Sequence, residues 1–251
     1  KNFFLGATHE AGHYATGQKG MGGRAGTWMD AQDDGVLSGN PIAQGAVDSV
    51  VAVHTLIPGS GGDKTVYYWM VAAQSWAGHW DALHEVNAKL VERGPAAFFA
   101  RTRSYWRLWV RKEPVDFAEL GPQLVDLYRR SLLILRTQID NHGAIIAAND
   151  SDVTQFNRDT YSYLWPRDGA LVAHALDQCG YPELALRFFT FCADVLTDEG
   201  FLLHKYNPDR SLASSWHPWI IGGQSQLPIQ EDETALVVWA LWQHFQRYRD
   251  L

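Results

Sequence analysis

The chain has 251 residues, is 46% hydrophobic and 20% charged, and carries a formal net charge of -7. This composition is ordinary for a globular protein that buries a core. The acidic balance argues against nucleic acids and anionic membranes as partners, because both select basic patches. No apolar run is long enough to span a membrane and no leader peptide is visible, so a cytoplasmic location is expected. The chain starts with lysine rather than Met, which leaves room for a missing upstream segment.

The first 76 residues predict β-structure. Two runs rich in β-branched and aromatic residues, Val47–Leu56 and Thr65–Ala73, flank the turn-forming segment Pro58–Asp63. Runs of this composition are typical of strands, and a glycine-rich turn between them predicts an antiparallel hairpin.

One N-terminal segment, His9-Glu-Ala-Gly-His13, matches the H-E-x-x-H pattern of zinc peptidases. That pattern works on a helix, which places both histidines on one face for Zn²⁺ and leaves Glu10 as the base. Glycines flank the segment, no helical apolar pattern surrounds it, and no third ligand is fixed by spacing. We therefore expect a strand or loop, with no metal and no cofactor. A zinc peptidase using His9, Glu10 and His13 stays a remote alternative.

Two helices are predicted between residues 77 and 116. Trp80–Arg93 carries one apolar stripe, and Gly94-Pro95 ends it. Ala96–Lys112 carries aromatic residues with arginines between them, and Pro114 marks a boundary. This pair is expected to connect the β region with the segment 117–251.

Residues 117–251 predict an antiparallel helical array with long loops at alternate junctions. The loop Phe201–Ile229 is long for a connector, which indicates a functional loop. The two cysteines, Cys179 and Cys192, lie on successive helices without motif spacing and are expected to be free thiols. The predicted helices are Phe117–Ile139, one from Pro166 to a stop at Gly180, Pro182–Leu196, and Asp232–Tyr248.

Chemistry-bearing residues gather where one of these helices begins. In Tyr161-Ser-Tyr-Leu-Trp-Pro-Arg-Asp168, three aromatic residues precede an arginine and an aspartate. Proline suits the first turn of a helix, so Trp165, Arg167 and Asp168 are expected at a loop–helix junction. Such junctions present polar groups to ligands. The alternative is structural: a buried aromatic cluster with an Arg–Asp pair that fixes the helix start.

Residues 161–170 resemble the first active-site loop of glycoside hydrolase family 15, which comprises the glucoamylases and their bacterial relatives. Ser215–Trp219 and Leu227–Leu236 resemble two further segments of the family, in the same order. The resemblance implies that residues 1–76 are the end of an antiparallel β-sandwich and that 77–116 are a helical linker. It also implies that 117–251 form the first part of an (α/α)6 barrel, with four of its twelve helices.

The resemblance also implies roles for individual residues. An arginine fork and a carboxylate both form strong, directional bonds to a sugar diol. Aromatic faces bind the C–H faces of sugars. For Glu231 and its acidic neighbours, simple favourable charge at a helix N-terminus is the alternative. The implied substrate-binding residues are Arg167 and Asp168, which grip the non-reducing-end glucose, the aromatic walls Trp165 and Trp216, Tyr161 near the developing oxocarbenium centre, and the polar rim of Gln230, Glu231 and Asp232.

The family's acid and base are not among these residues. The family's general acid lies in a Trp-Glu-Glu type segment further along the chain and its base near the end of the barrel, but no Trp-Glu dipeptide occurs here. The chain therefore resembles a truncated, inverting, exo-acting α-glucosidase that retains the glucose-gripping half of the site and is inactive alone. The alternative is a non-catalytic carbohydrate-binding or interaction protein.

The expected partner is an α-glucoside or a small oligosaccharide. Four helices of a twelve-helix barrel would expose apolar stripes, so association with the rest of a longer chain, or self-association, is also expected.

Overall fold

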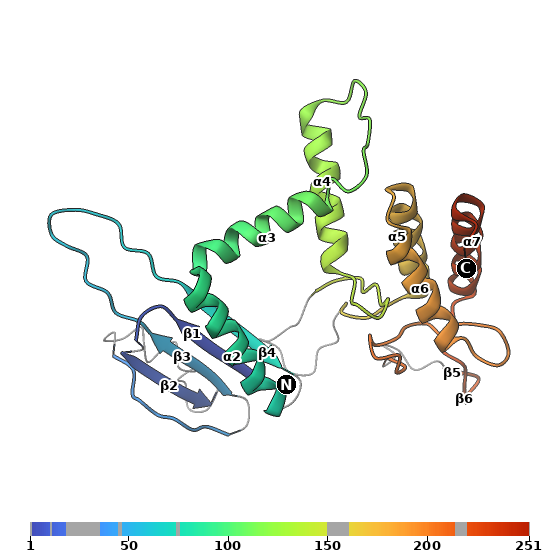
Figure 1. Ribbon diagram of the computed structural model, residues 1–251. Coiled ribbons are helices and arrows are strands. Elements are labelled where there is room, and N and C mark those ends of the chain that lie inside the picture. Colours follow the sequence, from blue (N-terminus) through green and yellow to red (C-terminus); the bar gives the residue numbers. More distant parts are fainter. Residues whose placement is uncertain are drawn as a thin grey trace. The chain divides into compact units, whose positions relative to one another are not determined.

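The computed structural model divides into two compact units, Lys1–Arg103 and Ser104–Leu251 (Figure 1). The division falls inside a helix, α3 (Pro95–Trp109), so the three domains 1–76, 77–116 and 117–251 stay a prediction. The structure describes residues 2–10, 12–18, 36–44, 47–73, 76–149, 161–213 and 220–250.

The N-terminal unit contains two antiparallel strand pairs. The first joins β1 (Asn2–Ala7) to β4 (Tyr68–Ala73), and the second joins β2 (His13–Gln18) to β3 (Val47–Ala52). Each described sheet of this unit has two strands, so the expected β-sandwich stays a prediction.

The predicted hairpin between the runs 47–56 and 65–73 is wrong. Both runs contain a strand, but β3 and β4 each pair with a strand from the N-terminus. Gly61 N–H does donate to Pro58 O at 3.1 Å, which closes the expected turn. The residues on either side of that turn, 53–58 and 61–67, are not paired in strands. A tight turn imposes strand pairing only when the strands continue directly into it.

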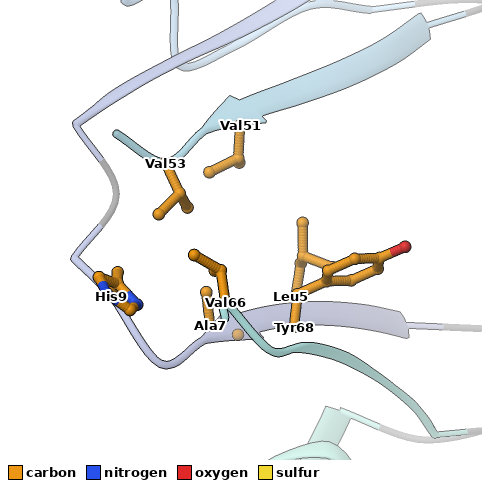
Figure 2. A pocket seen from close by; sticks show the side chains of 8 residues that line it. Leu5, Ala7, His9, Val51, Val53, Val66 and Tyr68 are labelled. Atoms are coloured by element: carbon orange, nitrogen blue, oxygen red, sulfur yellow. The ribbon is translucent and has the colours of Figure 1, made fainter. Parts of the chain in front are cut away.

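Apolar side chains of the two strand pairs line a cavity of about 390 Å³ (Figure 2). Leu5 and Ala7 come from β1, Val51 from β3 and Tyr68 from β4, while His9 follows β1. Exposure alternates along β3, and Val51, which lines the cavity, lies on the more exposed face of the strand.

Two helices follow the strands, as predicted. The first, α2 (Trp76–Arg93), packs against β4 and β1 and begins earlier than the expected Trp80. Gly94, with φ of 73°, separates it from α3, because glycine adopts this conformation without strain. The second helix, α3, ends at Trp109 rather than Lys112, since Lys112 N–H bonds only three residues back, to Trp109 O.

Besides the end of α3, the C-terminal unit contains four helices in its described residues, which fits the predicted helical array, while the (α/α)6 barrel stays a prediction. No helix in the described part of the chain is long and apolar enough to cross a membrane. Both cysteines are free, as predicted. The helices are α4 (Pro122–Thr137), α5 (Pro166–Gln178), α6 (Pro182–Val195) and α7 (Glu231–Tyr248).

The predicted start and end of the first of these helices are wrong. The chain turns at Ala118, where φ is 46°, and α4 begins only at Pro122. Proline occupies the first helical turn because its missing N–H has no intrahelical partner there. At the other end, Ile139 leaves the helix to form an isolated bridge with Ile145.

Three helices, α5, α6 and α7, pack against one another and hold the core of this unit (Figure 1). Phe188 on α6 is fully buried. It lies against Gly169, where an added Cβ would come within 2.3 Å of Phe188 Cε2. Glycine at this position therefore lets α6 approach the first turn of α5 closely.

The C-terminal ends of α5 and α7 are joined by a buried pair of side chains, Asp177 and His244. His244 Nδ1 lies 2.9 Å from Asp177 Oδ1, and both side chains are buried. Tyr248 OH donates to Asp177 O at 2.7 Å. The predicted stop at Gly180 is confirmed, with φ of 84° and an N–H bond to Asp177 O. The two helices are thus held together at their C-terminal ends, and their N-terminal ends also lie near each other, joined by side-chain contacts.

Candidate functional site

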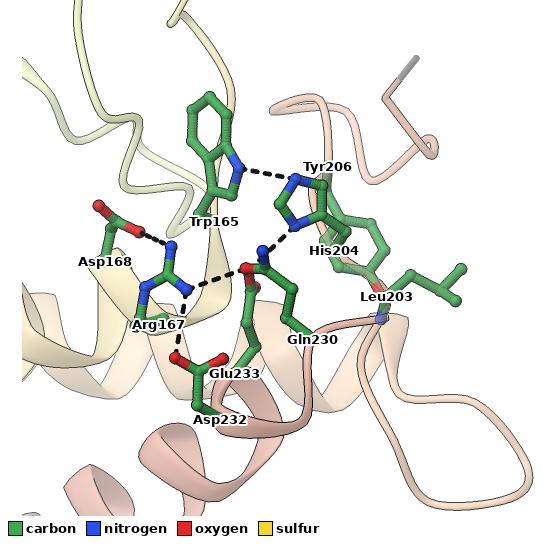
Figure 3. Close-up of polar contacts among 9 residues, drawn as sticks. All are labelled: Trp165, Arg167, Asp168, Leu203, His204, Tyr206, Gln230, Asp232 and Glu233. Atoms are coloured by element: carbon green, nitrogen blue, oxygen red, sulfur yellow. Dashed lines mark hydrogen bonds and ion pairs between the residues drawn. The ribbon is translucent and has the colours of Figure 1, made fainter. Parts of the chain in front are cut away.

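The N-terminal ends of α5 and α7 meet at a cluster of polar side chains around Arg167 (Figure 3). Arg167 Nη1 donates to Gln230 Oε1 at 2.9 Å and to Asp232 Oδ2 at 3.2 Å. Its Nη2 lies 3.5 Å from Asp168 Oδ2. Four residues that the sequence marked as one site therefore touch, although α5 and α7 are far apart in the chain.

The charges in this cluster favour one another. Partial burial would lower the pKa of Arg167, but the bond to Asp232 and the nearby Asp168 and Glu233 outweigh it and raise that pKa. Both aspartates also lie in the first turn of a helix, where the dipole favours negative charge. About half of each aspartate side chain remains exposed, so an entering ligand can reach both carboxylates.

Aromatic rings flank the arginine. Trp165, directly before α5, is 5% exposed, and Tyr161 is 54% exposed with its ring centroid 5.8 Å from that of Trp165. Lys205 Nζ lies 4.4 Å from the centroid of Tyr163. Two backbone bonds of 2.9 Å between Leu164 and Tyr206 fix the loop before α5 to the loop after α6. The site thus combines an aromatic surface, an arginine and two carboxylates.

Two of the predicted site residues are not part of this cluster as described. Glu231 begins α7 and is exposed, and it is not among the described partners of Arg167. Trp216 lies outside the described residues. The roles given to both stay predictions.

Two residues that the sequence did not mark, His204 and Glu233, lie directly behind the cluster. Trp165 Nε1 donates to His204 Nε2 at 3.3 Å, and His204 Nδ1 lies 3.2 Å from Glu233 Oε1. Glu233 is fully buried. Glu233 lies three residues after Gln230, and residues at this spacing are neighbours on one face of a helix. This spacing is the signal that could have identified Glu233. No comparable pattern marks His204.

Burial controls the ionisation of both groups. It raises the pKa of Glu233 to about 8, against the opposing pull of Arg167. It also lowers the pKa of His204, and the positive charges of Lys205 and Arg167 add to that effect. At neutral pH the pair is therefore a neutral imidazole beside a carboxylic acid.

This ionisation predicts that stability falls with pH. Folded Glu233 holds its proton up to about pH 8, whereas an unfolded glutamate releases it near its ordinary pKa of 4.5. Because the folded state binds the extra proton, the free energy of unfolding decreases across this window, by at most about 1.4 kcal/mol per pH unit. His204 has the opposite effect below its ordinary pKa of 6.5, because its pKa is lowered on folding and the unfolded state there binds the extra proton. The interval from pH 6.5 to 8 therefore reports the ionisation of Glu233.

Urea unfolding at pH 6.5 and 8 measures this slope. Glu233→Gln keeps the size of the side chain and cannot ionise, so this variant is expected to lose the fall seen in the unaltered chain. All other titrating groups are common to the two proteins and cancel. Equal slopes in both would show that Glu233 is ionised when folded.

The H-E-x-x-H segment does not form the helix that a zinc peptidase requires. His9 follows β1 and His13 begins β2, which confirms the expected strand and loop. His13 instead packs edge-on against His54, with ring centroids 5.1 Å apart. Within the described ranges, no group of three or more His, Cys, Asp or Glu side chains could hold a metal ion.

Comparison with known proteins finds a relative among the glycosyl hydrolases. The chain is 27% identical over 123 residues to an uncharacterized glycosyl hydrolase, MJ1610, of Methanocaldococcus jannaschii. The match covers 49% of this chain and 17% of that relative, so the chain spans only a small part of the relative's length. The relative is archaeal, and nothing found supports the bacterial origin that the resemblance suggested. No family model matches the chain.

Two solved structures of single-substitution glycosidase variants are also similar. Each is 20% identical and covers 52% of this chain and 38% of its own, with TM-scores of 0.39 and 0.38. Similarity at this level does not define a shared fold.

Proposed function

We propose that this chain carries the sugar-binding half of a glycoside hydrolase site. The partial match to a glycosyl hydrolase supports the general class. The observation that carries the proposal is the convergence of Arg167, Asp168 and Asp232 beside Trp165 at the joined N-termini of two helices. A cation, two reachable carboxylates and an aromatic surface form the set that a hexose requires.

The ligand that suits this set is the non-reducing glucose unit of an α-glucoside. Two adjacent hydroxyls of a sugar can accept from the Arg167 fork and donate to Asp168 or Asp232. Hydrogen bonds to charged groups contribute about 1.5–3 kcal/mol each. The exposed ring of Tyr161, which lies against the buried ring of Trp165, offers apolar surface to the C–H groups of the sugar.

Binding and hydrolysis are separate in this proposal. A glycosidase needs one carboxyl group as the acid and a second as base or nucleophile. Asp168 and Asp232 are both paired with Arg167. Glu233 carries a proton but is fully buried. We therefore assign sugar binding to these residues, and assign inverting, exo-acting α-glucosidase chemistry of the glucoamylase type to a longer protein that supplies the acid and base.

Calorimetry with maltose, isomaltose and trehalose tests the binding assignment, with β-linked cellobiose as the control. At least one α-linked sugar is expected to bind more tightly than cellobiose, and none is expected to release glucose. Absence of binding by all three would overturn the proposal. Glucose release by the chain itself would mean that Asp168 or Asp232 works as an acid.

A non-catalytic carbohydrate-binding protein is the second candidate, favoured by the full burial of Glu233, the carboxyl group of the site whose pKa is raised. Hydrolysis by a longer protein that contains this chain would exclude it. Self-association stays part of both candidates, since Val238 and Trp242 on α7 are 62% and 53% exposed.

A further inference from the structure

Three elements behind the sugar-facing cluster are connected by one chain of hydrogen bonds. Glu233 lies on α7, His204 in the loop after α6, and Trp165 at the start of α5 (Figure 3). Glu233 Oε1 lies 3.2 Å from His204 Nδ1, and His204 Nε2 lies 3.3 Å from Trp165 Nε1. These hydrogen bonds lead from buried Glu233, between α5 and α7, to the Trp165 ring that flanks Arg167.

The direction of these bonds follows from their chemistry. An indole N–H can only donate, so His204 Nε2 accepts from Trp165. A neutral imidazole then carries its hydrogen on Nδ1, which faces Glu233 Oε1, and the ring also bonds to the Gln230 side chain. His204 is therefore oriented by partners on both sides, and any change at Glu233 reaches the indole through a single ring.

The backbone holds the imidazole in place. His204 N–H donates to Pro228 O at 2.6 Å. The preceding N–H, of Leu203, donates to the hydroxyl of Tyr206 at 2.7 Å. The position of His204 is thus set by the loop, and what remains adjustable is the orientation of its ring.

Charged and titratable groups face Glu233 from several elements. Arg167 and Asp168 face it from α5, Asp232 from α7, and His204 and Tyr206 from the loop, with Lys205 beside His204 and the Cys192 thiol on α6 also nearby. Oε2 of Glu233 is buried and lacks a hydrogen-bond partner among the described residues. Burial raises the pKa of this carboxyl group to about 8, so it is neutral when the sugar site is at physiological pH. Its ionisation would add a third carboxylate competing for Arg167.

We propose that His204 and Glu233 are positioning residues that hold the Trp165 indole and leave Arg167 available for sugar. This inference rests on the proposed sugar-binding function. Neither residue needs to touch the ligand: His204 orients the buried Trp165 ring, which supports the exposed Tyr161 and flanks Arg167, and neutral Glu233 orients His204.

Two variants separate positioning from mere packing. His204→Phe keeps a ring in the same space but removes the ring's hydrogen bonds to Trp165, Glu233 and Gln230, and it is expected to weaken maltose binding by about 2- to 10-fold. Glu233→Gln still offers a carbonyl oxygen to His204 Nδ1, so this variant is expected to bind maltose at pH 6.5 as tightly as the unaltered protein. The affinity of the unaltered chain is expected to fall between pH 6.5 and about pH 9, as Glu233 ionises, while that of Glu233→Gln stays constant.

The experiment is maltose calorimetry at both pH values, together with ¹H–¹⁵N spectra of the indole N–H groups. The Trp165 signal is expected to move with a midpoint near pH 8 in the unaltered chain and to stay fixed in Glu233→Gln. Assignment comes from Trp165→Phe. The spectra are recorded without sugar and therefore test the hydrogen bonds independently of binding. If maltose does not bind but the Trp165 signal still moves with pH, only the sugar-binding function is overturned. A Trp165 signal unaffected by pH, or the same pH-dependent loss of affinity in Glu233→Gln as in the unaltered chain, would overturn the positioning role.

Discussion

Replacing Arg167 with lysine is expected to weaken maltose binding by about 10- to 100-fold. Arg167 contacts Gln230 and Asp232 with one nitrogen and faces Asp168 with the other. A lysine ammonium keeps the positive charge but is a compact point donor that cannot present the planar fork. The loss should therefore fall on the directional bonds to the sugar hydroxyls, and calorimetry measures it.

A matched control exists in the same unit. Arg210 also pairs with a carboxylate, Asp194, through Nε at 3.0 Å and Nη2 at 2.8 Å, but this pair lies outside the candidate site. Arg210→Lys is expected to leave maltose affinity unchanged. Equal losses in the two variants would mean that Arg167 contributes only general positive charge.

Replacing Phe188 with alanine is expected to destabilise the C-terminal unit by about 3–5 kcal/mol. Phe188 is fully buried on α6 and fills the space that Gly169 leaves open on α5. Removing the ring deletes apolar contacts and leaves a cavity that the closely packed helices can refill only in part. Urea unfolding followed by far-UV circular dichroism measures the change.

Phe99→Ala is the control for this substitution, because the same atoms are removed from a side chain that is 65% exposed. Its effect is expected to stay well below that of Phe188→Ala. A small effect at Phe188 would show that α5 and α6 do not pack as described.

Local signals were sufficient for the helices that carry the site. Pro166 and Pro182 lie at helix starts, Gly180 lies just past a helix end, and an apolar stripe lies between them, so α5 and α6 were predicted nearly to the residue. The start of α4 was missed because apolar residues continue upstream of Pro122 as far as Phe117. The strand pairing was missed because β1 and β2 are distant partners, and no local pattern specifies which strand β3 or β4 meets.

The site was predictable only as far as resemblance extends. Arg167, Asp168, Gln230 and Asp232 were expected together because of similar family segments, and the structure brings them into contact. Glu233 was read only as charge at a helix start. Its burial results from the packing of α7 on α5 and from the path of the loop that carries His204, and a sequence does not display either feature.

The central claim is that the Arg167 cluster binds the non-reducing glucose of an α-glucoside. Saturation-transfer NMR with maltose tests it most directly, because the signal of each sugar ring reports its contact with the protein. The account predicts strong transfer to the non-reducing ring of maltose, and loss of that transfer in Arg167→Lys but not in Arg210→Lys. Transfer mainly to the reducing ring, or transfer that survives in Arg167→Lys, would contradict it.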